Sequence, residues 1–309
     1  MTETVSICPL CGETGSRIFD QRSFRGFPVT NRICENCGFV FQSPRMTEVE
    51  LQEFYAAEYR RLYQGSEGPA VKDLATQAQR ARHLLDFLQR NTTRSDAFNE
   101  DSLFLDIGSS SGKLLECFGQ AFNCRVVGVE PGDAYRREAQ SRGLDVYATL
   151  EGFEQSGQYP CSLVSLIHVL EHLPDPIPYL VHIRQKLLQP GGWLLLEVPN
   201  LYAHDCFEVA HLASFSSHTL AETLKQAGFE IVVLKKHGSP RSRLLPLYLT
   251  LLARPKPDLA PSAQESPASP AVQREISPEH NVQIKRRVGM FQRRALSRLF
   301  PSLAWIPIP

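Results

Sequence analysis

The sequence lacks an apolar run long enough to cross a lipid bilayer. Its longest uncharged apolar stretch lies near residues 244–253, well short of the roughly 20 residues that a spanning helix needs. The first residues, Met-Thr-Glu-Thr-Val, have neither the basic nor the apolar segment of a secretory signal. We therefore expect a cytoplasmic protein.

The sequence also lacks an excess of charge of either sign. Lys plus Arg and Asp plus Glu both number 33, so the net charge does not point to a polyanionic partner. Within residues 1–45, five arginines are offset by four acidic residues, which is a weak footprint for phosphate binding. Nucleic acid is therefore not the expected partner.

The 309 residues are enough for two domains, and composition divides them into five segments. Residues 99–254 alternate strand-like and helix-like runs, which predicts an α/β fold with a mostly parallel sheet covered on both faces. The seven predicted strands lie near residues 103–107, 125–130, 146–147, 162–168, 193–198, 229–235 and 247–253. The other segments are a cysteine-bearing module at 1–45, a helical segment at 46–98, a Pro/Ser-rich linker at 255–280 and a basic amphipathic tail at 281–309.

Four of the eight cysteines form two C-x-x-C-G units, at residues 8–12 and 34–38. In a reducing compartment, paired cysteines indicate a metal site more than disulfides. Two residues between the cysteines let a tight turn direct both thiolates at one ion, and two such turns complete a tetrahedral site. The sequence therefore predicts a structural zinc ribbon with the ligands Cys8, Cys11, Cys34 and Cys37.

A loop rich in small residues follows the first predicted strand of the α/β domain: Asp106-Ile107-Gly108-Ser109-Ser110-Ser111-Gly112. It fits neither the G-x-G-x-x-G dinucleotide pattern nor the P-loop, because three serines separate its glycines and Leu114 follows Lys113. The second predicted strand ends in Glu130, 18 residues beyond Gly112, where an acid suits the two hydroxyls of a ribose. The loop and Glu130 together predict a nucleoside ligand.

Five motifs between residues 100 and 235 resemble, in order, those of class I S-adenosylmethionine-dependent methyltransferases. They are Asp106-x-Gly108-x-x-x-Gly112, Val129-Glu130-Pro131, the run Ile167–Pro176, Leu187-Leu188-Gln189-Pro190-Gly191-Gly192 and Val198-Pro199-Asn200. The cysteine module with the following segment to Tyr59, and the run His211–Leu220, look like the corresponding parts of sugar C-methyltransferases.

The resemblance implies a Rossmann-like seven-stranded methyltransferase sheet behind the small zinc ribbon. It implies S-adenosylmethionine as the cofactor and a small polar acceptor, with a nucleotide-linked sugar as the first candidate. The residues implied for cofactor binding are Asp106, Gly108, Ser110, Gly112, Glu130, Pro131, His168 and Glu171. Three features depart from the family pattern. Ser110 replaces a glycine that many members have, and the pair Cys161-Ser162 replaces the usual aromatic-acid pair that opens the fourth strand. Ala210 stands before His211 where relatives often have Glu.

The resemblance also implies that His211 is the catalytic base. A sulfonium methyl group is already activated, so the protein must align donor and acceptor, exclude water and remove a proton. An unperturbed histidine titrates near neutrality and suits the last task. His172 and Tyr59 are further catalytic candidates, although Tyr55 and Tyr59, four residues apart on a predicted helix, also suit simple packing.

Two alternatives stay open at this point. The methyl group could be transferred to an oxygen or nitrogen of another metabolite, or the chain could be a non-catalytic zinc-ribbon scaffold. The tail adds a further question, because residues 281–309 carry six basic residues and no acidic one. Five of its apolar residues share one helical face: Ile284, Val288, Phe291, Ala295 and Leu299. Packing on the protein's own domain or on a partner is favoured over an anionic membrane surface, and the oligomeric state is open.

Overall fold

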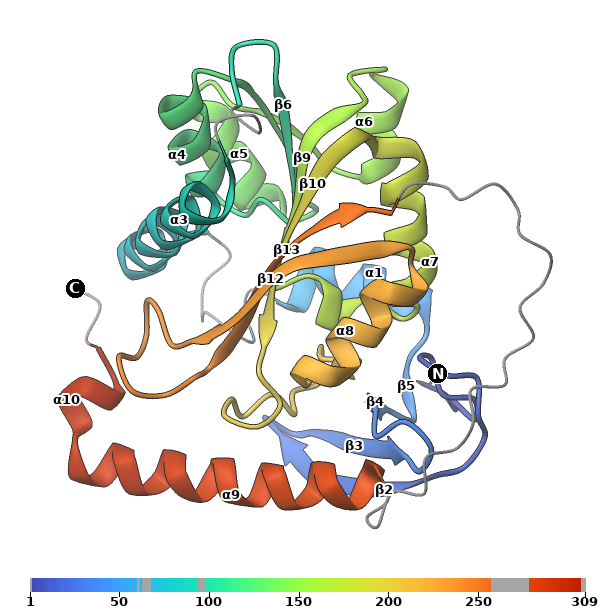
Figure 1. Cartoon of the computed structure of the whole chain (residues 1–309). Helices are drawn as coiled ribbons and strands as arrows, with labels where there is room; N and C mark the ends of the chain where they lie inside the picture. The colour runs from blue at the N-terminus through green and yellow to red at the C-terminus, as the bar shows by residue number, and fades with distance from the viewer. Residues whose placement is uncertain (1, 60–61, 63–67, 94–97, 257–277, 307–309) are drawn as a thin grey trace.

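A seven-stranded sheet forms the centre of the protein (Figure 1). The computed structural model describes residues 2–59, 62, 68–93, 98–256 and 278–306. The strand order is β12-β13-β10-β9-β6-β7-β8. Their bounds are β6 (Leu103–Ile107), β7 (Arg125–Val129), β8 (Asp145–Tyr147), β9 (Cys161–Ile167), β10 (Leu188–Pro199), β12 (Phe229–His237) and β13 (Tyr248–Pro255). Strand β13 runs antiparallel to both of its neighbours and the remaining pairs are parallel, which confirms the predicted mostly parallel α/β sheet.

Helices cover both faces of this sheet, as its apolar strands require. All five residues of β6 are buried, so neither face of the strand can be left to water. One face is covered by α3 (Val71–Asn91), α4 (Lys113–Phe122) and α5 (Asp133–Ser141). The other is covered by α6 (Leu150–Gln155), α7 (Pro176–His182) with the π-helical turn η4 (Ile183–Leu187), and α8 (Ser217–Gln226). The short 3₁₀ turn η3 (Leu170–His172) follows β9 at the carboxyl edge of the sheet.

The cysteine-bearing segment shares a second, smaller sheet with the α/β domain. The strand order is β11-β4-β3-β2, with β2 (Ser16–Phe24), β3 (Phe27–Cys34), β4 (Val40–Gln42) and β11 (Ala213–Ser214). Strand β1 (Thr2–Glu3) pairs with β5 (Arg45–Met46). Helix α1 (Glu48–Glu53) and the π-helical turn η1 (Phe54–Glu58) then lead towards α3. Because β11 follows His211 by two residues, the N-terminal sheet is attached directly to the segment that carries the predicted base.

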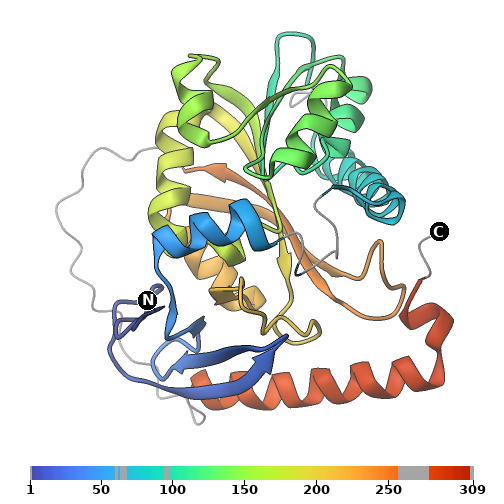
Figure 2. The same cartoon turned by 180° about the vertical axis from the view of Figure 1, so that it is seen from behind.

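The tail forms α9 (Pro278–Leu299) and the short α10 (Pro301–Ala304). Figures 1 and 2 show α9 lying along the N-terminal sheet and the loop that follows β10. It packs there through Val282 and Arg286, which are buried, and through Gly289. A Cβ at Gly289 would lie 2.0 Å from the carbonyl oxygen of Tyr202, so only glycine permits this close approach.

The predicted apolar face of the tail is not the face that packs. Ile284, Val288, Phe291 and Leu299 are all exposed, from 44% for Ile284 to 72% for Phe291. The helix packs on its own domain, as one of the predicted alternatives holds, but through the face that carries Val282, Arg286 and Gly289. The physical reason is that the loop after β10 presents backbone carbonyls to α9, and an arginine can donate to them where an apolar side chain cannot.

The predicted linker falls mainly on residues 257–277, which lie outside the described residues. Across the described ranges, no helix combines the length and the apolar character that crossing a bilayer requires.

Candidate active site

A cavity of about 770 Å³ opens at the carboxyl ends of the parallel strands, within the usual size range of small-molecule sites. At one end it is lined by the glycine loop and Glu130, and at the other by Tyr55, Tyr59, His172 and His211. We call these last four residues the histidine cluster. Carboxyl ends of parallel strands are where ligands of open α/β sheets bind.

The glycine loop approaches its neighbours closely. Gly108 has a φ of +78°, and a Cβ there would lie 2.5 Å from Cγ2 of Val169. Gly112 has a φ of +76°, and its Cβ would lie 2.3 Å from Cδ1 of Leu144. Both positions therefore need glycine for conformation and for space. Ser110, between them, has a φ of +52°, so it adopts a conformation that favours glycine.

Glu130 holds the loop from the end of β7. Its carboxylate accepts hydrogen bonds from the backbone N–H of Ser110 at 2.8 Å and of Gly132 at 2.9 Å. Glu130 also lines the cavity, so it both positions the loop and contributes a carboxylate to the cavity wall.

Asp106 is buried at the end of β6. The pKa of its carboxyl is raised to about 7, mainly by burial. The hydrogen bond from the Ser165 hydroxyl lowers this pKa, and the neighbouring charge of Glu130 raises it. The charged form is costly in this apolar site. A cationic ligand at this end of the cavity would favour the ionised carboxylate.

His168 lies between two buried carboxylates. Its Nδ1 is 3.2 Å from Oε1 of Glu171, and its Nε2 is 3.1 Å from Oε1 of Glu197. Glu197 also pairs with Arg80 and accepts a hydrogen bond from the hydroxyl of Thr250. Burial and Arg80 lower the pKa of His168, but hydrogen bonds to the two carboxylates outweigh them and raise it. Nothing in the local sequence pattern marks Glu197 or Arg80, so neither was predicted to belong to the site.

The structure brings together the three predicted catalytic residues, His211, His172 and Tyr59. Ring centroids are 4.9 Å apart for His172 and His211, and 5.9 Å apart for Tyr59 and His172. The ring centroids of Tyr55 and Tyr59 lie 5.0 Å apart. Burial lowers the pKa of His172 to about 4, so its imidazole is neutral near pH 7. The tyrosines pack against each other and also line the cavity, so both predicted roles for them are compatible with the geometry.

The backbone orients His211 in place of the glutamate that stands before this histidine in the family pattern. Its Nδ1 donates to the carbonyl oxygen of Cys206 at 2.9 Å. Because a carbonyl only accepts, Nδ1 carries the proton and Nε2 keeps its lone pair. The carboxylate of Glu208 lies 3.9 Å from that Nε2. Neither Glu208 nor the Cys206 carbonyl was predicted from the sequence as a partner of His211.

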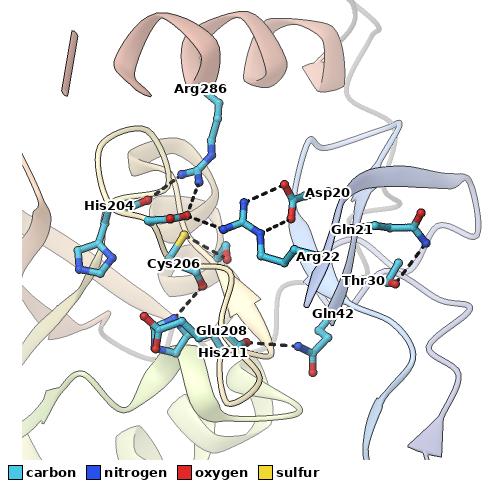
Figure 3. A network of polar contacts seen from close by, with 12 residues as sticks. Asp20, Gln21, Arg22, Thr30, Gln42, His204, Cys206, Glu208, His211 and Arg286 are labelled. Atoms are coloured by element: carbon cyan, nitrogen blue, oxygen red, sulfur yellow. Dashed lines mark hydrogen bonds and ion pairs between the residues drawn. The ribbon is translucent and has the colours of Figure 1, made fainter. Parts of the chain in front are cut away.

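The loop that carries His211, residues 200–212, is held from two sides (Figure 3). From the N-terminal sheet, Arg22 pairs with Asp205 at 2.8 Å, and the side-chain amide of Gln42 donates to the Glu208 carbonyl at 3.4 Å. From α9, Arg286 donates to the carbonyl of His204 at 2.8 Å and to that of Leu201. Segments from both ends of the chain thus position the predicted base.

The four paired cysteines converge, as their spacing predicts. Sγ of Cys8 lies 3.7 Å from Sγ of Cys37, and Sγ of Cys11 lies 3.5 Å from Sγ of Cys34. All four sulfurs lie within 4.8 Å of one another. The lining of the active-site cavity does not include them, so this group is separate from the candidate active site.

Comparison with known proteins agrees with this architecture. A family model described as a methyltransferase domain matches residues 76–234. No curated protein compared with the chain matches it. Among solved structures, magnesium protoporphyrin IX methyltransferase from Synechocystis PCC 6803 is 15% identical, with a TM-score of 0.46, and the match covers 67% of this chain and 96% of that one. An S-adenosylmethionine-dependent methyltransferase from Archaeoglobus fulgidus is also 15% identical, with a TM-score of 0.46 and coverages of 63% and 97%.

The seven-stranded sheet and the family match define a class I methyltransferase. The chain belongs to the methyltransferase domain family, whose model covers about half of it. It is an S-adenosylmethionine-dependent methyltransferase, and the prediction of an enzyme of this class is confirmed.

Proposed function

We propose that this enzyme transfers a methyl group from S-adenosylmethionine to a carbon of a nucleotide-linked sugar, with His211 as the base. The observation that carries the proposal is the continuity of one cavity from the glycine loop to the histidine cluster. A donor held at one end and an acceptor at the other would meet inside it.

The glycine-loop end fits the cofactor. Gly108 and Gly112 let the loop pack closely on Val169 and Leu144. Gly108 and Glu130 line the cavity, where the Glu130 carboxylate would accept hydrogen bonds from ribose hydroxyls. Asp106 would face the cationic part, with Ser110, Pro131, His168 and Glu171 completing this end. When bound, S-adenosylmethionine supplies a methyl group activated on a sulfonium. The protein's part is to align it, exclude water and handle the acceptor's proton.

The histidine end fits an acceptor that must lose a proton. Nε2 of His211 keeps its lone pair, and Glu208 lies close enough to stabilise the imidazolium that would form. Methylation at carbon needs a C–H next to a carbonyl, because only such a proton is acidic enough for a histidine. Tyr59 and His172 would position the sugar.

A nucleotide-linked acceptor also needs a cation for its phosphates. Arg241 is exposed and lines the same cavity, so it could meet a diphosphate at the mouth. This charge is the feature that favours a nucleotide-linked acceptor over an uncharged metabolite.

We also propose that the four cysteines bind one structural zinc ion. Four thiolates at this separation form a closed tetrahedral set without an open position for catalysis. The ion would stabilise the segment 1–45 as a module that supports the loop carrying His211.

The first test is calorimetric titration of the purified protein with S-adenosylmethionine. We expect micromolar binding in the wild type, and its loss in Asp106→Ala and Glu130→Ala. Glu222→Ala is the matched control, because this acid on α8 pairs with the exposed Lys225 and is absent from the cavity lining. No binding in folded wild-type protein would contradict the assigned site.

A second test separates carbon from oxygen or nitrogen as the methyl acceptor. A nucleotide-linked keto sugar is incubated with the enzyme and S-adenosylhomocysteine in D₂O. Deuterium should enter the carbon next to the carbonyl, and His211→Ala should stop the exchange. Methyl transfer without any exchange would favour an O- or N-methyltransferase.

A further inference from the structure

Two histidines and one glutamate form a second group of ligand-type side chains, separate from the cysteines. Glu171, His172 and His211 each offer one ligand atom, and these atoms lie within 4.8 Å of one another. All three line the active-site cavity. Two imidazoles and a carboxylate with open positions form a ligand set typical of divalent transition metals.

Both imidazoles are held in the tautomer that binds metal. Nδ1 of His172 donates to the carbonyl oxygen of Ala210 at 2.8 Å, and Nδ1 of His211 donates to that of Cys206 at 2.9 Å. Each Nε2 therefore keeps its lone pair. Metal-bound histidines almost always donate their other N–H to a carbonyl, carboxylate or water, which fixes the ring before the ion binds.

The carboxylate of Glu171 is a second, separate indication of a cation at this place. Glu171 is 1% exposed, and its Oε1 is bonded to Nδ1 of His168. Its Oε2 is buried and has no hydrogen-bond partner within the described parts of the chain. A buried carboxylate oxygen without a partner costs free energy, and a cation beside the two imidazoles would satisfy it.

We propose that Glu171, His172 and His211 bind one divalent metal ion of the Mn²⁺, Fe²⁺, Co²⁺ or Zn²⁺ class, with open coordination positions facing the cavity. Glu171 then belongs to the acceptor end of the cavity and not to the cofactor-binding end. Binding of the ion depends on no assumption about the acceptor. Only its role rests on the proposed function: an acceptor oxygen would occupy an open position. In the metal-loaded protein Nε2 of His211 would be a ligand and the ion would polarise the acceptor carbonyl. The proton that leaves the acceptor carbon would then pass to the carboxylate of Glu208, which lines the same cavity.

The experiment uses the full chain with the cysteine site already loaded with zinc. Mn²⁺ is the probe, because thiolates prefer softer ions and carboxylates suit Mn²⁺. Electron paramagnetic resonance measures the free Mn²⁺ that remains at each addition. We expect about one bound equivalent in the wild type, and affinity weakened by at least about a hundredfold in Glu171→Gln and in His172→Gln.

His204→Gln is the matched control. His204 is half-buried and lines the same cavity, but it is not part of the three-residue group. It should keep the Mn²⁺ equivalent. No bound Mn²⁺ in folded wild-type protein, or equal binding in Glu171→Gln, would overturn the proposal.

The experiments can contradict the metal site and the proposed methyl-transfer function independently of each other. S-adenosylmethionine binding, measured by calorimetry on the same samples, reports on the cofactor site and on folding. Cofactor binding without Mn²⁺ binding removes the metal and leaves His211 as the base. Mn²⁺ binding without cofactor binding keeps the metal site and contradicts the proposed function.

Discussion

Arg22 in the N-terminal sheet forms an ion pair with Asp205 in the loop after β10, with 2.8 Å between Nη1 and Oδ1. Asp205 lies six residues before the predicted base His211. On its other side, Nη2 of Arg286 lies 3.6 Å from the same Asp205 oxygen. One loop residue thus links segments near both ends of the chain to the candidate active site.

Removing the Arg286 side chain should loosen the loop. Arg286 is buried, donates to the carbonyls of Leu201 and His204, and stacks 4.3 Å from the Phe207 ring centroid. Arg286→Ala should lower the free energy of unfolding by about 2–3 kcal/mol, measured by urea titration. Arg287→Ala, at the exposed neighbouring position, should change it by less than about 0.5 kcal/mol. Equal effects of the two variants would contradict the role of Arg286.

Replacing His211 should affect turnover and spare the cofactor. We expect His211→Ala to reduce methyl transfer by roughly a hundredfold or more, because the acceptor loses its base or its metal. S-adenosylmethionine affinity should stay within a few-fold of the wild type. His218→Ala, at an exposed position on α8, serves as the control. Unchanged turnover in His211→Ala would remove this residue from the mechanism.

Cofactor binding should depend on pH through Asp106. Because burial raises the pKa of Asp106 to about 7, the carboxyl is protonated below that pH, and a cationic ligand favours the ionised form. Affinity for S-adenosylmethionine should therefore fall by up to about tenfold per pH unit below 7 and level off above it. Asp106→Asn should bind more weakly with a flatter profile, measured by calorimetry between pH 5.5 and 8.5. A wild-type profile as flat as that of the variant would contradict this assignment.

The raised pKa of Asp106 also makes the stability of the ligand-free protein depend on pH. The folded pKa lies above the ordinary value of 3.8, so the folded state is favoured while Asp106 is protonated. This contribution is complete below about pH 4 and is lost as the pH rises through about 7. Asp106→Asn should remove this part of the pH dependence from thermal unfolding curves.

Replacing Ser110 in the glycine loop with glycine should increase the stability of the fold. Ser110 has a φ of +52°, a conformation that costs a residue with a side chain about 1–2 kcal/mol. Ser110→Gly should stabilise the fold by about 0.5–1 kcal/mol, since the greater freedom of glycine in the unfolded chain offsets part of the gain. The hydrogen bond from the Ser110 N–H to Glu130 is retained, because it comes from the backbone. Ser109→Gly is the control, since Ser109 is not among the residues with positive φ, and it should not stabilise.

The cysteine group should contain zinc. Freshly purified protein should carry about one equivalent by elemental analysis, and Cys34→Ser should lower both the zinc content and the melting temperature. Cys161→Ser, a buried cysteine in β9 outside the group, should keep the zinc. Less than about half an equivalent in the wild type would count against the site.

The sequence alone determines the features that depend on near neighbours or on the regular geometry of a parallel sheet. The two C-x-x-C-G turns are local, so their cysteines could be assigned and are found together. Asp106, Gly108, Gly112 and Glu130 follow adjacent parallel strands, whose carboxyl ends must share one edge, so their convergence was also predictable. The alternation of apolar strand-like runs with helix-like runs predicted the seven-stranded sheet, because this alternation is typical of a mostly parallel sheet covered by helices.

Only the tertiary structure decides how distant segments meet. His172 and His211 are 39 positions apart, and their rings meet because each is held by a backbone carbonyl of the loop between β10 and β11. The partners of His211, the Cys206 carbonyl and Glu208, belong to an irregular loop without periodicity to mark them. In α9, periodicity identified the apolar face, but Arg286 and Gly289 make the contact. Helical periodicity shows which residues share a face, whereas the facing surface, here a row of backbone carbonyls, determines which face is buried.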